Sequence, residues 1–287
     1  MKSNLRHLFE LNFATVILGS SGLLGKLIIL PPPVIIFGRC VIAATALLVL
    51  FAFLKQSIKI KLGQNRVTFV LSGVLLAAHW VTYFFALKLS TVAIAFLTLF
   101  TFPIVTTLLE PIFLKTRLSW FDLLGAIIIF LGVSLLLPDL NFSNDTTLGA
   151  FLGLFSAVLY ALRNILNKKL VQQYPSSLIM FYQLLITTTL LFPALFTMSY
   201  EFTREDLLWL LVLGVGTTAI GHTMFVQSFK HFSVSTASVI TSMQPVYGII
   251  LAVLVLDEKI GWRVAIGGSL IILTVIMESM KQYFKKE

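Results

Sequence analysis

Residues 33–54 read PVIIFGRCVIAATALLVLFAFL, an apolar stretch that contains a single charged residue, Arg39. A helix needs about 20 apolar residues to cross the roughly 30 Å hydrocarbon layer of a bilayer. The stretch follows two further prolines, Pro31 and Pro32, and proline is tolerated in the first turn of a helix but not in its interior. The pattern therefore predicts a membrane-spanning helix that begins near Pro33.

The composition extends this interpretation to the whole chain. Of the 287 residues, 58% are hydrophobic and 11% are charged, whereas a soluble domain averages about 25% charged residues. A water-soluble globule is therefore excluded, and the apolar runs predict an all-α integral membrane protein with ten transmembrane helices. The predicted spans are 8–28, 33–54, 67–87, 90–114, 119–138, 147–170, 176–198, 206–229, 233–256 and 260–280.

The first run follows Lys2 and Arg6 and therefore resembles a secretion signal. Because no small-x-small cleavage site closes it and nine apolar runs follow, we interpret it as a retained membrane helix. The single cysteine, Cys40, excludes an internal disulfide. The net charge of +9 lies in short loops rather than on one face of a domain, so no nucleic-acid partner is expected.

The distribution of basic residues predicts the orientation in the cell membrane, which in a bacterium would be the inner membrane. Lys and Arg concentrate in cytoplasmic loops. Of 21 such residues, Arg39 lies inside a span and fifteen lie on the side of the N-terminus. The other side has Lys26, Lys88, Arg204, Lys259 and Arg263. Both termini are therefore predicted to be cytoplasmic.

The two halves of the chain repeat each other at an offset of 142 residues. The offset superimposes Lys26 on Lys168, Pro33 on Pro175, Lys88 on Lys230, Pro103 on Pro245, Trp120 on Trp262 and Gly125 on Gly267. Each half has five predicted spans, an odd number, so the second half must enter the membrane with opposite polarity. The expected organisation is a five-helix module at 1–138, an extracytoplasmic linker at 139–146 and a second module at 147–287. Such inverted repeats are typical of secondary transporters.

Two stretches carry a family resemblance. One runs from His79-Trp80-Val81-Thr82-Tyr83 through Pro103 to Leu109-Glu110-Pro111, and the other from Ser233-Val234-Ser235-Thr236-Ala237 through Gln244-Pro245 to Leu256-Asp257-Glu258-Lys259. Together they resemble the paired modules of the EamA family in the drug/metabolite transporter superfamily. The resemblance implies a permease whose first, third, fourth, sixth, eighth and ninth helices surround a central cavity. The first module has Lys115-Thr116-Arg117 where the second has Asp257-Glu258-Lys259, so no role is transferred to Lys115 or Thr116.

Pro103 and Pro245 are candidate hinges, because a proline in mid-span removes one backbone hydrogen bond. The alternative is that they are ordinary membrane-helix prolines. Glu110 lies within a predicted span, where a carboxylate is costly and faces a cavity or a partner. It is a candidate substrate or proton site, and a pair with Arg163 is a further hypothesis. The alternative is an interfacial carboxylate that reaches water.

His79 and His222 lie in mid-span and could bind a ligand or titrate near neutral pH, or they could simply bond a neighbouring helix. Tyr160, Arg163 and Asn164 share one helix face by their i, i+3 and i+4 spacing. The predicted wall of the substrate cavity comprises Trp80, Tyr83, Tyr160, Asn164, Gln244 and Tyr247. Arg39 is expected to snorkel to the nearby boundary, with attraction of an anionic substrate as the alternative.

No phosphate-binding loop, CxxC or HExxH motif is present. No catalytic residue, metal site or cofactor is therefore predicted, and an intramembrane enzyme is disfavoured. The expected function is a permease that exports or exchanges a small metabolite, such as an amino acid or an amphipathic compound, by alternating access. A flippase for a lipid or lipid-linked precursor is the alternative. Membrane lipids and a small-molecule substrate are the expected partners; proton coupling and oligomeric state are left open.

Overall fold

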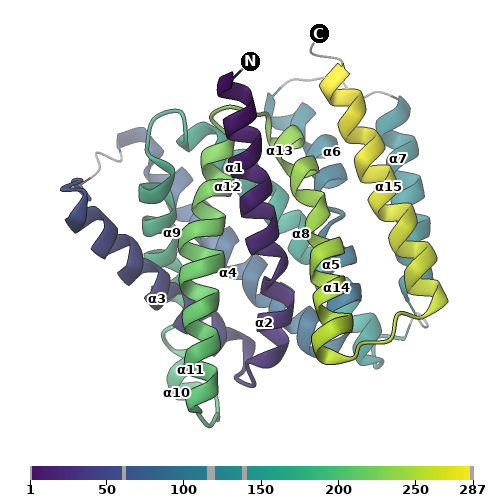
Figure 1. Ribbon diagram of the computed structural model, residues 1–287, viewed down its shortest axis with the longest axis horizontal. Helices are drawn as coiled ribbons and strands as arrows, with labels where there is room; N and C mark the ends of the chain where they lie inside the picture. The colour runs from purple at the N-terminus through teal and green to yellow at the C-terminus, as the bar shows by residue number, and fades with distance from the viewer. Residues whose placement is uncertain (1, 60–62, 115–119, 138–140, 285–287) are drawn as a thin grey trace.

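The computed structural model describes residues 2–59, 63–114, 120–137 and 141–284. Throughout these ranges the regular structure is helical, and the helices form one bundle (Figure 1). Lys61, Lys115, Thr116, Arg117, Lys285 and Lys286, together with Asp139 of the predicted linker, lie outside the described residues, and so does the side chain of Glu110.

The first half of the chain supplies the helices up to the linker. They are α1 (Lys2–Gly19), α2 (Ser21–Leu27), α3 (Pro32–Phe53), η1 (Gly63–Asn65), α4 (Arg66–Leu89), α5 (Val92–Leu99), α6 (Phe102–Leu114) and α7 (Trp120–Leu136). The second half supplies α8 (Asp145–Leu170), α9 (Ser176–Leu191), α10 (Ala194–Thr197), α11 (Arg204–Leu211), η2 (Val212–His222), α12 (Thr223–Ser228), α13 (Val234–Ile240), η3 (Thr241–Met243), α14 (Gln244–Leu256) and α15 (Trp262–Phe284).

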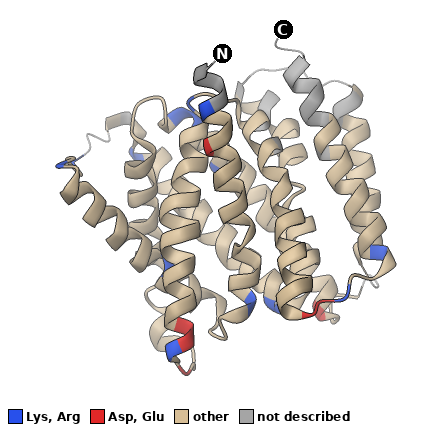
Figure 2. Cartoon of the chain, in the orientation of Figure 1, with Lys and Arg blue, Asp and Glu red and all other residues tan. Residues whose placement is uncertain are grey.

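Eight described helical segments are long and apolar enough to cross a membrane, namely 6–27, 32–53, 66–89, 92–109, 145–170, 176–197, 204–228 and 236–256. Two shorter apolar helices, Leu123–Leu136 and Trp262–Thr274, fall on the remaining predicted spans. The surface agrees with this membrane assignment, because Phe53, Phe130 and Leu254 are each more than 70% exposed. Lys, Arg, Asp and Glu gather at the two ends of the bundle (Figure 2). The chain is therefore a multi-pass membrane protein.

Polar caps and prolines define the ends of several helices. Asn144 accepts hydrogen bonds from the backbone N–H groups of Thr146 and Thr147 at the start of α8. Thr203 and Asp206 form a reciprocal capping box at the start of α11. These contacts satisfy N–H groups that have no partner within the helix. Asp257 ends α14 in the left-handed region, with φ of 54°.

Two spans are broken at equivalent places. The fourth span divides into α5 and α6, and the ninth divides into α13, the 3₁₀ turn η3 and α14. Pro103 and Pro245 are the second residues of α6 and α14, so each proline lies directly after the break rather than inside a continuous helix. This placement avoids the steric clash that an interior proline makes with the preceding turn. Their role as hinges stays a prediction.

The eighth predicted span contains an element that the apolar pattern does not reveal. Residues 212–222 form η2, an 11-residue π-helix, between α11 and α12. π-Helical turns are rare and occur frequently at functional sites. Thr217 and Thr218 both lie in η2, and their hydroxyl groups both donate to the Leu213 carbonyl, at 2.6 and 3.0 Å. The wide turn therefore places two consecutive threonine hydroxyls on the same side.

Helices from the two halves pack closely through small residues. Gly149 and Gly153 of α8 lie against Ser90 and Thr98 of the first half. At one edge of the bundle α7 and α15 pack as a pair (Figure 1), and the backbones approach each other at Gly132 and Gly267. Small residues permit such approach in membrane helices, where close packing rather than water exclusion drives association.

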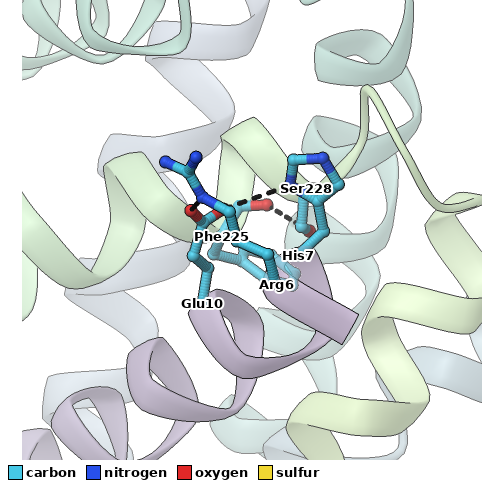
Figure 3. Close-up of polar contacts among 5 residues, drawn as sticks. All are labelled: Arg6, His7, Glu10, Phe225 and Ser228. Atoms are coloured by element: carbon cyan, nitrogen blue, oxygen red, sulfur yellow. Dashed lines mark hydrogen bonds and ion pairs between the residues drawn. The ribbon is translucent and has the colours of Figure 1, made fainter. Parts of the chain in front are cut away.

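A polar cluster on α1 lies beside α12 at the end of the bundle where α1 begins (Figure 3). Arg6 Nε donates to Glu10 Oε1 at 2.9 Å, and His7 Nδ1 lies 3.2 Å from Glu10 Oε2. The His7 ring stacks on His231, with ring centroids 3.5 Å apart. Burial and the neighbouring His7 lower the pKa of His231, and Lys230 and Lys168 add to this effect while Glu10 opposes it. The stack therefore favours a neutral His231.

Replacing Gly267 with Val is expected to destabilise the α7–α15 pair. A Cβ atom at residue 267 would lie 2.5 Å from the carbonyl oxygen of Gly132, and a backbone atom cannot rotate away. Overpacking of this kind costs about 1–3 kcal/mol, which a thermal unfolding measurement in detergent detects. The control is Gly261→Val, because no heavy atom lies within 4 Å of a Cβ built there. Equal unfolding temperatures for both variants would contradict the close contact.

Acidification is expected to weaken the contact between α1 and His231. The folded-state pKa of His231 lies below its ordinary value of 6.5. The contribution of neutral His231 to the free energy of unfolding is therefore fully present above pH 6.5. It is lost as the pH falls from 6.5 through the folded-state pKa. His231→Phe keeps a stacking ring but removes the titration, so the variant should show a flatter dependence of unfolding temperature on pH between 7.5 and 5. The same slope in both proteins would rule out this contribution.

Candidate functional site

A small cavity lies inside the bundle, at the middle of the spans. His79, Phe100 and Tyr160 line it, and each lies near the middle of its own span, 66–89, 92–109 and 145–170. The full lining consists of Leu18, Ser21, Arg39, His79, Trp80, Tyr83, Phe96, Leu99, Phe100, Tyr160, His222 and Gln244. Residues on both sides of the linker therefore contribute to one shared cavity.

Six of the ten predicted substrate-site residues line this cavity, namely His79, Trp80, Tyr83, Tyr160, His222 and Gln244. Arg163 and Asn164 are fully buried but lie outside the lining. Tyr247 is half-buried and lies against Gly19 of α1. The side chain of Glu110 is outside the described residues, so the hypothesis of a Glu110–Arg163 pair is not tested.

The prediction that Arg39 snorkels to the membrane boundary is wrong. Its side chain is 1% exposed and lines the cavity. Nε donates to Thr218 Oγ1 at 2.9 Å, and Nη2 donates to Thr218 and Thr217 at 2.7 and 3.2 Å. The guanidinium carbon lies 4.2 Å from the centre of the Trp80 ring. The hydroxyls of η2 and this aromatic face hold the cation inside the bundle. These partners are distant in sequence, so a local sequence pattern does not reveal them.

His79 bridges the two halves at the cavity. Its Nδ1 lies 2.7 Å from Ser156 Oγ, and the same hydroxyl donates to the His79 carbonyl at 2.8 Å. Because the single hydroxyl proton of Ser156 is used in that bond, His79 must donate through Nδ1–H. The neutral ring then keeps a lone pair on Nε2. Tyr160 stacks on the ring with centroids 4.3 Å apart, which fixes the plane of the imidazole.

His222 also lines the cavity. Its ring meets the Trp80 ring edge to face, with centroids 5.2 Å apart. Its buried Nδ1 has no hydrogen-bond partner among the described residues. An unsatisfied buried nitrogen is costly unless a ligand or water completes it. Of the two histidines, His222 therefore has a ring nitrogen, Nδ1, that is available to bind a ligand, whereas Nδ1 of His79 is bonded to Ser156.

Arg163 belongs to a separate buried network next to the cavity. Nε and Nη2 donate to Gln183 Oε1 at 3.2 and 2.7 Å, and Nη2 also lies 3.0 Å from Met180 Sδ. Gln183 in turn donates to Ser72 and Asn167. Tyr160, one turn earlier on α8, separates the guanidinium from the cavity, with its ring centre 5.9 Å from the guanidinium carbon. Of the three residues on this helix face, Tyr160 therefore lines the cavity, whereas Arg163 and Asn164 lie outside its lining.

Sequence reasoning missed several lining residues, namely Leu18, Ser21, Phe96, Leu99 and Phe100. Among 25 phenylalanines in the chain, a cavity-lining one has no distinguishing pattern. For Leu99 and Phe100 the sequence offers one indication, namely that they lie just before Pro103, at the break between α5 and α6. Arg39 also lines the cavity. It belongs to α3, the second span, which is not among the cavity helices that the resemblance implies.

A larger cavity of about 360 Å³ opens at the end of the bundle where α1 begins, beside the cluster of Figure 3. Its lining includes His7, Glu10 and Leu11 of α1, together with Thr223 and Gln227 of α12. A third cavity, of about 310 Å³, is lined by Ile29, Leu30, Pro31, Ser199, Tyr200, Glu201, Thr203 and Asp206. There Asp206 Oδ1 accepts a hydrogen bond of 2.9 Å from the Ile29 N–H.

The helices separate the first two cavities by a thin layer. On α1, Leu11 lines the end cavity and Leu18 lines the central one, two turns further along. In the second half the adjacent residues His222 and Thr223 line the central and end cavities respectively. Leu11 and Leu18 are 1% and 2% exposed. The two cavities therefore follow one another along α1, with buried leucines at both.

Comparison with a solved structure supports the fold. A crystal structure of another protein superimposes with a TM-score of 0.74, covering 98% of this chain and 99% of that one, at 19% sequence identity. At this identity the likeness establishes the fold alone.

Three curated relatives are described as uncharacterized transporters. The protein from Archaeoglobus fulgidus is 27% identical over 68% of this chain and 69% of its own length. The one from Clostridium kluyveri is 26% identical over 66% of this chain and 63% of its own length. The one from Synechocystis is 24% identical over 61% and 54%. The chain thus covers less than two thirds of the latter two relatives.

The family comparison covers most of the chain. Residues 11–137 and 147–280 each match the model of the EamA-like transporter family. The two matched segments lie on either side of the segment predicted to link the modules. Together with the apolar helices of the bundle, these matches identify the chain as a membrane protein that belongs to the EamA-like transporter family.

Proposed function

We propose that this protein is a secondary transporter that moves a small metabolite, such as an amino acid or an amphipathic compound, across the cell membrane by alternating access. The observation that carries the proposal is the mid-span cavity lined by residues from both halves, among them Arg39, Tyr160 and His222. Secondary transporters built from repeats bind their substrate near mid-membrane, at the interface between the repeats.

Matching helix boundaries support two five-helix repeats. α5 and α13 begin at Val92 and Val234, and α6 and α14 begin at Phe102 and Gln244, each pair separated by 142 residues. The caps repeat as well, since Thr91 accepts from the Ile94 N–H and Ser233 from the Thr236 N–H, both at 3.1 Å. Unrelated apolar helices would not share both boundaries and caps at one offset.

A repeated lysine contact supports the inversion. Lys26 Nζ donates to the Ser90 carbonyl at 2.6 Å, and its equivalent Lys168 donates to the Phe232 carbonyl, 142 residues after Ser90, at 2.9 Å. Lys168 donates to the carbonyls of Phe229 and Phe232, which flank His231. Because His231 stacks on His7 of α1, Lys168 lies at the end of the bundle where α1 begins. Lys26 lies at the end of α2, beyond α1. The same contact thus occurs at opposite ends of the bundle.

We further propose ten crossings with both termini in the cytoplasm. Eight long spans and two shorter apolar helices make an even number of segments. α1 begins and α15 ends at the same end of the bundle (Figure 1). Fifteen of the 21 Lys and Arg residues were assigned to that side, and such residues mark the cytoplasmic side of a membrane protein.

The three cavities suggest how access would alternate. The end cavity beside His7 would open toward the cytoplasm, and the cavity beside Asp206 would open toward the outside. The Leu11–Leu18 layer would close the first route, and the bond between Asp206 and Ile29 would close the second. Rocking of one module against the other would open one layer as it closes the other.

Cysteine labelling tests this alternation. Cys40 is the single cysteine and is buried, so Cys40→Ala provides a background without thiols. In that background, Leu11→Cys and Leu30→Cys each place a thiol at a site that is no more than 2% exposed. We expect a change of pH or addition of a transported solute to raise labelling at one site while lowering it at the other. Parallel changes at both sites would contradict alternating access.

Solute flux tests the function itself. Purified protein in liposomes should move at least one solute of a broad metabolite panel without ATP, and the panel is best chosen by comparing metabolites inside and outside cells that overproduce or lack the protein. Protein-free liposomes are the control. Movement of a labelled lipid between leaflets, with no flux of soluble metabolites, would favour a flippase instead.

A further inference from the structure

The central cavity contains a buried positive charge. A guanidinium remains protonated in proteins, and Arg39 is 1% exposed at mid-bundle. Its hydrogen-bond partners, Thr217 and Thr218, are neutral hydroxyls. The twelve residues that line the cavity include no Asp or Glu. A buried charge without a counter-ion is costly, so an anion that entered the cavity would be stabilised there.

The hydrogen bonds of Arg39 leave one edge of the guanidinium free. Nε and Nη2 are engaged by the hydroxyls of η2, whereas Nη1 makes no hydrogen bond with any described residue. The two N–H bonds of Nη1 remain, and each can donate a charge-assisted hydrogen bond to a carboxylate oxygen. The threonines therefore orient the guanidinium, and its remaining N–H groups are available to a ligand.

Arg163 has the same bond pattern, because its buried Nη1 also lacks a partner among the described residues, but it lies outside the lining of the cavity. Its guanidinium is held by Gln183 and Met180, and Tyr160 stands between it and the cavity. It adds positive potential near the cavity without reaching it. The repeat equivalent of Arg163 is Ser21, which lines the cavity. The repeat equivalent of Arg39 is Phe181, which does not. The two cations are thus not symmetric copies, and only Arg39 can contact a solute in the cavity.

The rest of the lining suits an apolar body. Trp80, Phe96, Phe100 and Tyr160 provide aromatic faces, and Leu18 and Leu99 provide aliphatic ones. Small-molecule sites commonly combine such apolar walls with a few placed polar groups. The cavity volume of about 20 Å³ is close to that of a single water site, so the lining side chains must rearrange to admit an organic solute.

We infer that the solute of the central cavity is an organic anion with a carboxylate head group and an apolar body, and that the carboxylate pairs with the Nη1 edge of Arg39. This inference rests on the proposed transport function and specifies its substrate class. His222, whose Nδ1 has no partner among the described residues, supplies a second polar contact beside the head group.

The first test compares matched probes on the unaltered protein. The probes are 3-phenylpropionate, its neutral amide, and 3-phenylpropylamine, which share one apolar body and differ in the head group. We expect the carboxylate to raise the unfolding temperature in detergent by about 2 °C or more at saturation, and the other two to leave it unchanged. Equal or larger shifts with the amide or the amine would overturn the inference.

The second test uses variants. Arg39→Gln should weaken 3-phenylpropionate binding by about tenfold or more, because a hydrogen bond to a charged group contributes about 1.5–3 kcal/mol. Arg39→Lys keeps the charge but loses the N–H groups that the threonines orient, so its affinity should fall between those of Arg39→Gln and the unaltered protein. Arg263→Gln is the matched control, since that arginine is exposed and packs on Trp262. Unchanged affinity in Arg39→Lys and in any folded Arg39→Gln protein would overturn the inference.

Flux measurements separate this inference from the proposed function. If liposomes carry neutral or cationic solutes but not carboxylates, the transport function stands and the carboxylate assignment fails. If 3-phenylpropionate binds in an Arg39-dependent manner but no carboxylate crosses the membrane, the binding site stands and transport fails.

Discussion

A bilayer interior offers no hydrogen-bond partner to a polar group, and the structure depends on how the protein meets that constraint. Many threonine and serine hydroxyls bond back to a carbonyl four residues earlier, as Thr98 and Thr106 do. Groups that cannot be satisfied locally reach across to the other half. Ser156 meets His79, and the hydroxyls of η2 meet Arg39. Both contacts between the halves thus involve a residue that lines the cavity, His79 in one and Arg39 in the other.

Hydropathy predicts where the helices lie because a span must be apolar over a fixed length. All ten predicted segments coincide with apolar helices of the described structure. Hydropathy does not predict local winding, so the division between α1 and α2 and the π-helix η2 were not foreseen. The prolines indicate irregularity in the fourth and ninth spans, and both contain a break that ends two residues before the proline. The number of crossings and their inversion remain part of the proposal.

The site was harder to predict, because sequence spacing gives the face of a helix but not what covers that face. Tyr160, Arg163 and Asn164 do share a side of α8, yet only Tyr160 reaches the cavity. For Arg39 the error had a definite physical cause. Its position near the start of α3 suggested an escape to water, but threonines 178 and 179 residues later in the chain satisfy it inside. Such long-range partners leave no local pattern.

The buried guanidinium of Arg39 also affects what the protein keeps out. A transporter must not leak protons or sodium while its helices move, because such leaks would dissipate the ion gradients of the cell. A fixed positive charge in a narrow, largely apolar passage repels hydronium and metal cations, as positive groups do in other selective pores. The residue that would attract an organic anion therefore makes the centre of the bundle an electrostatic barrier to the commonest inorganic cations.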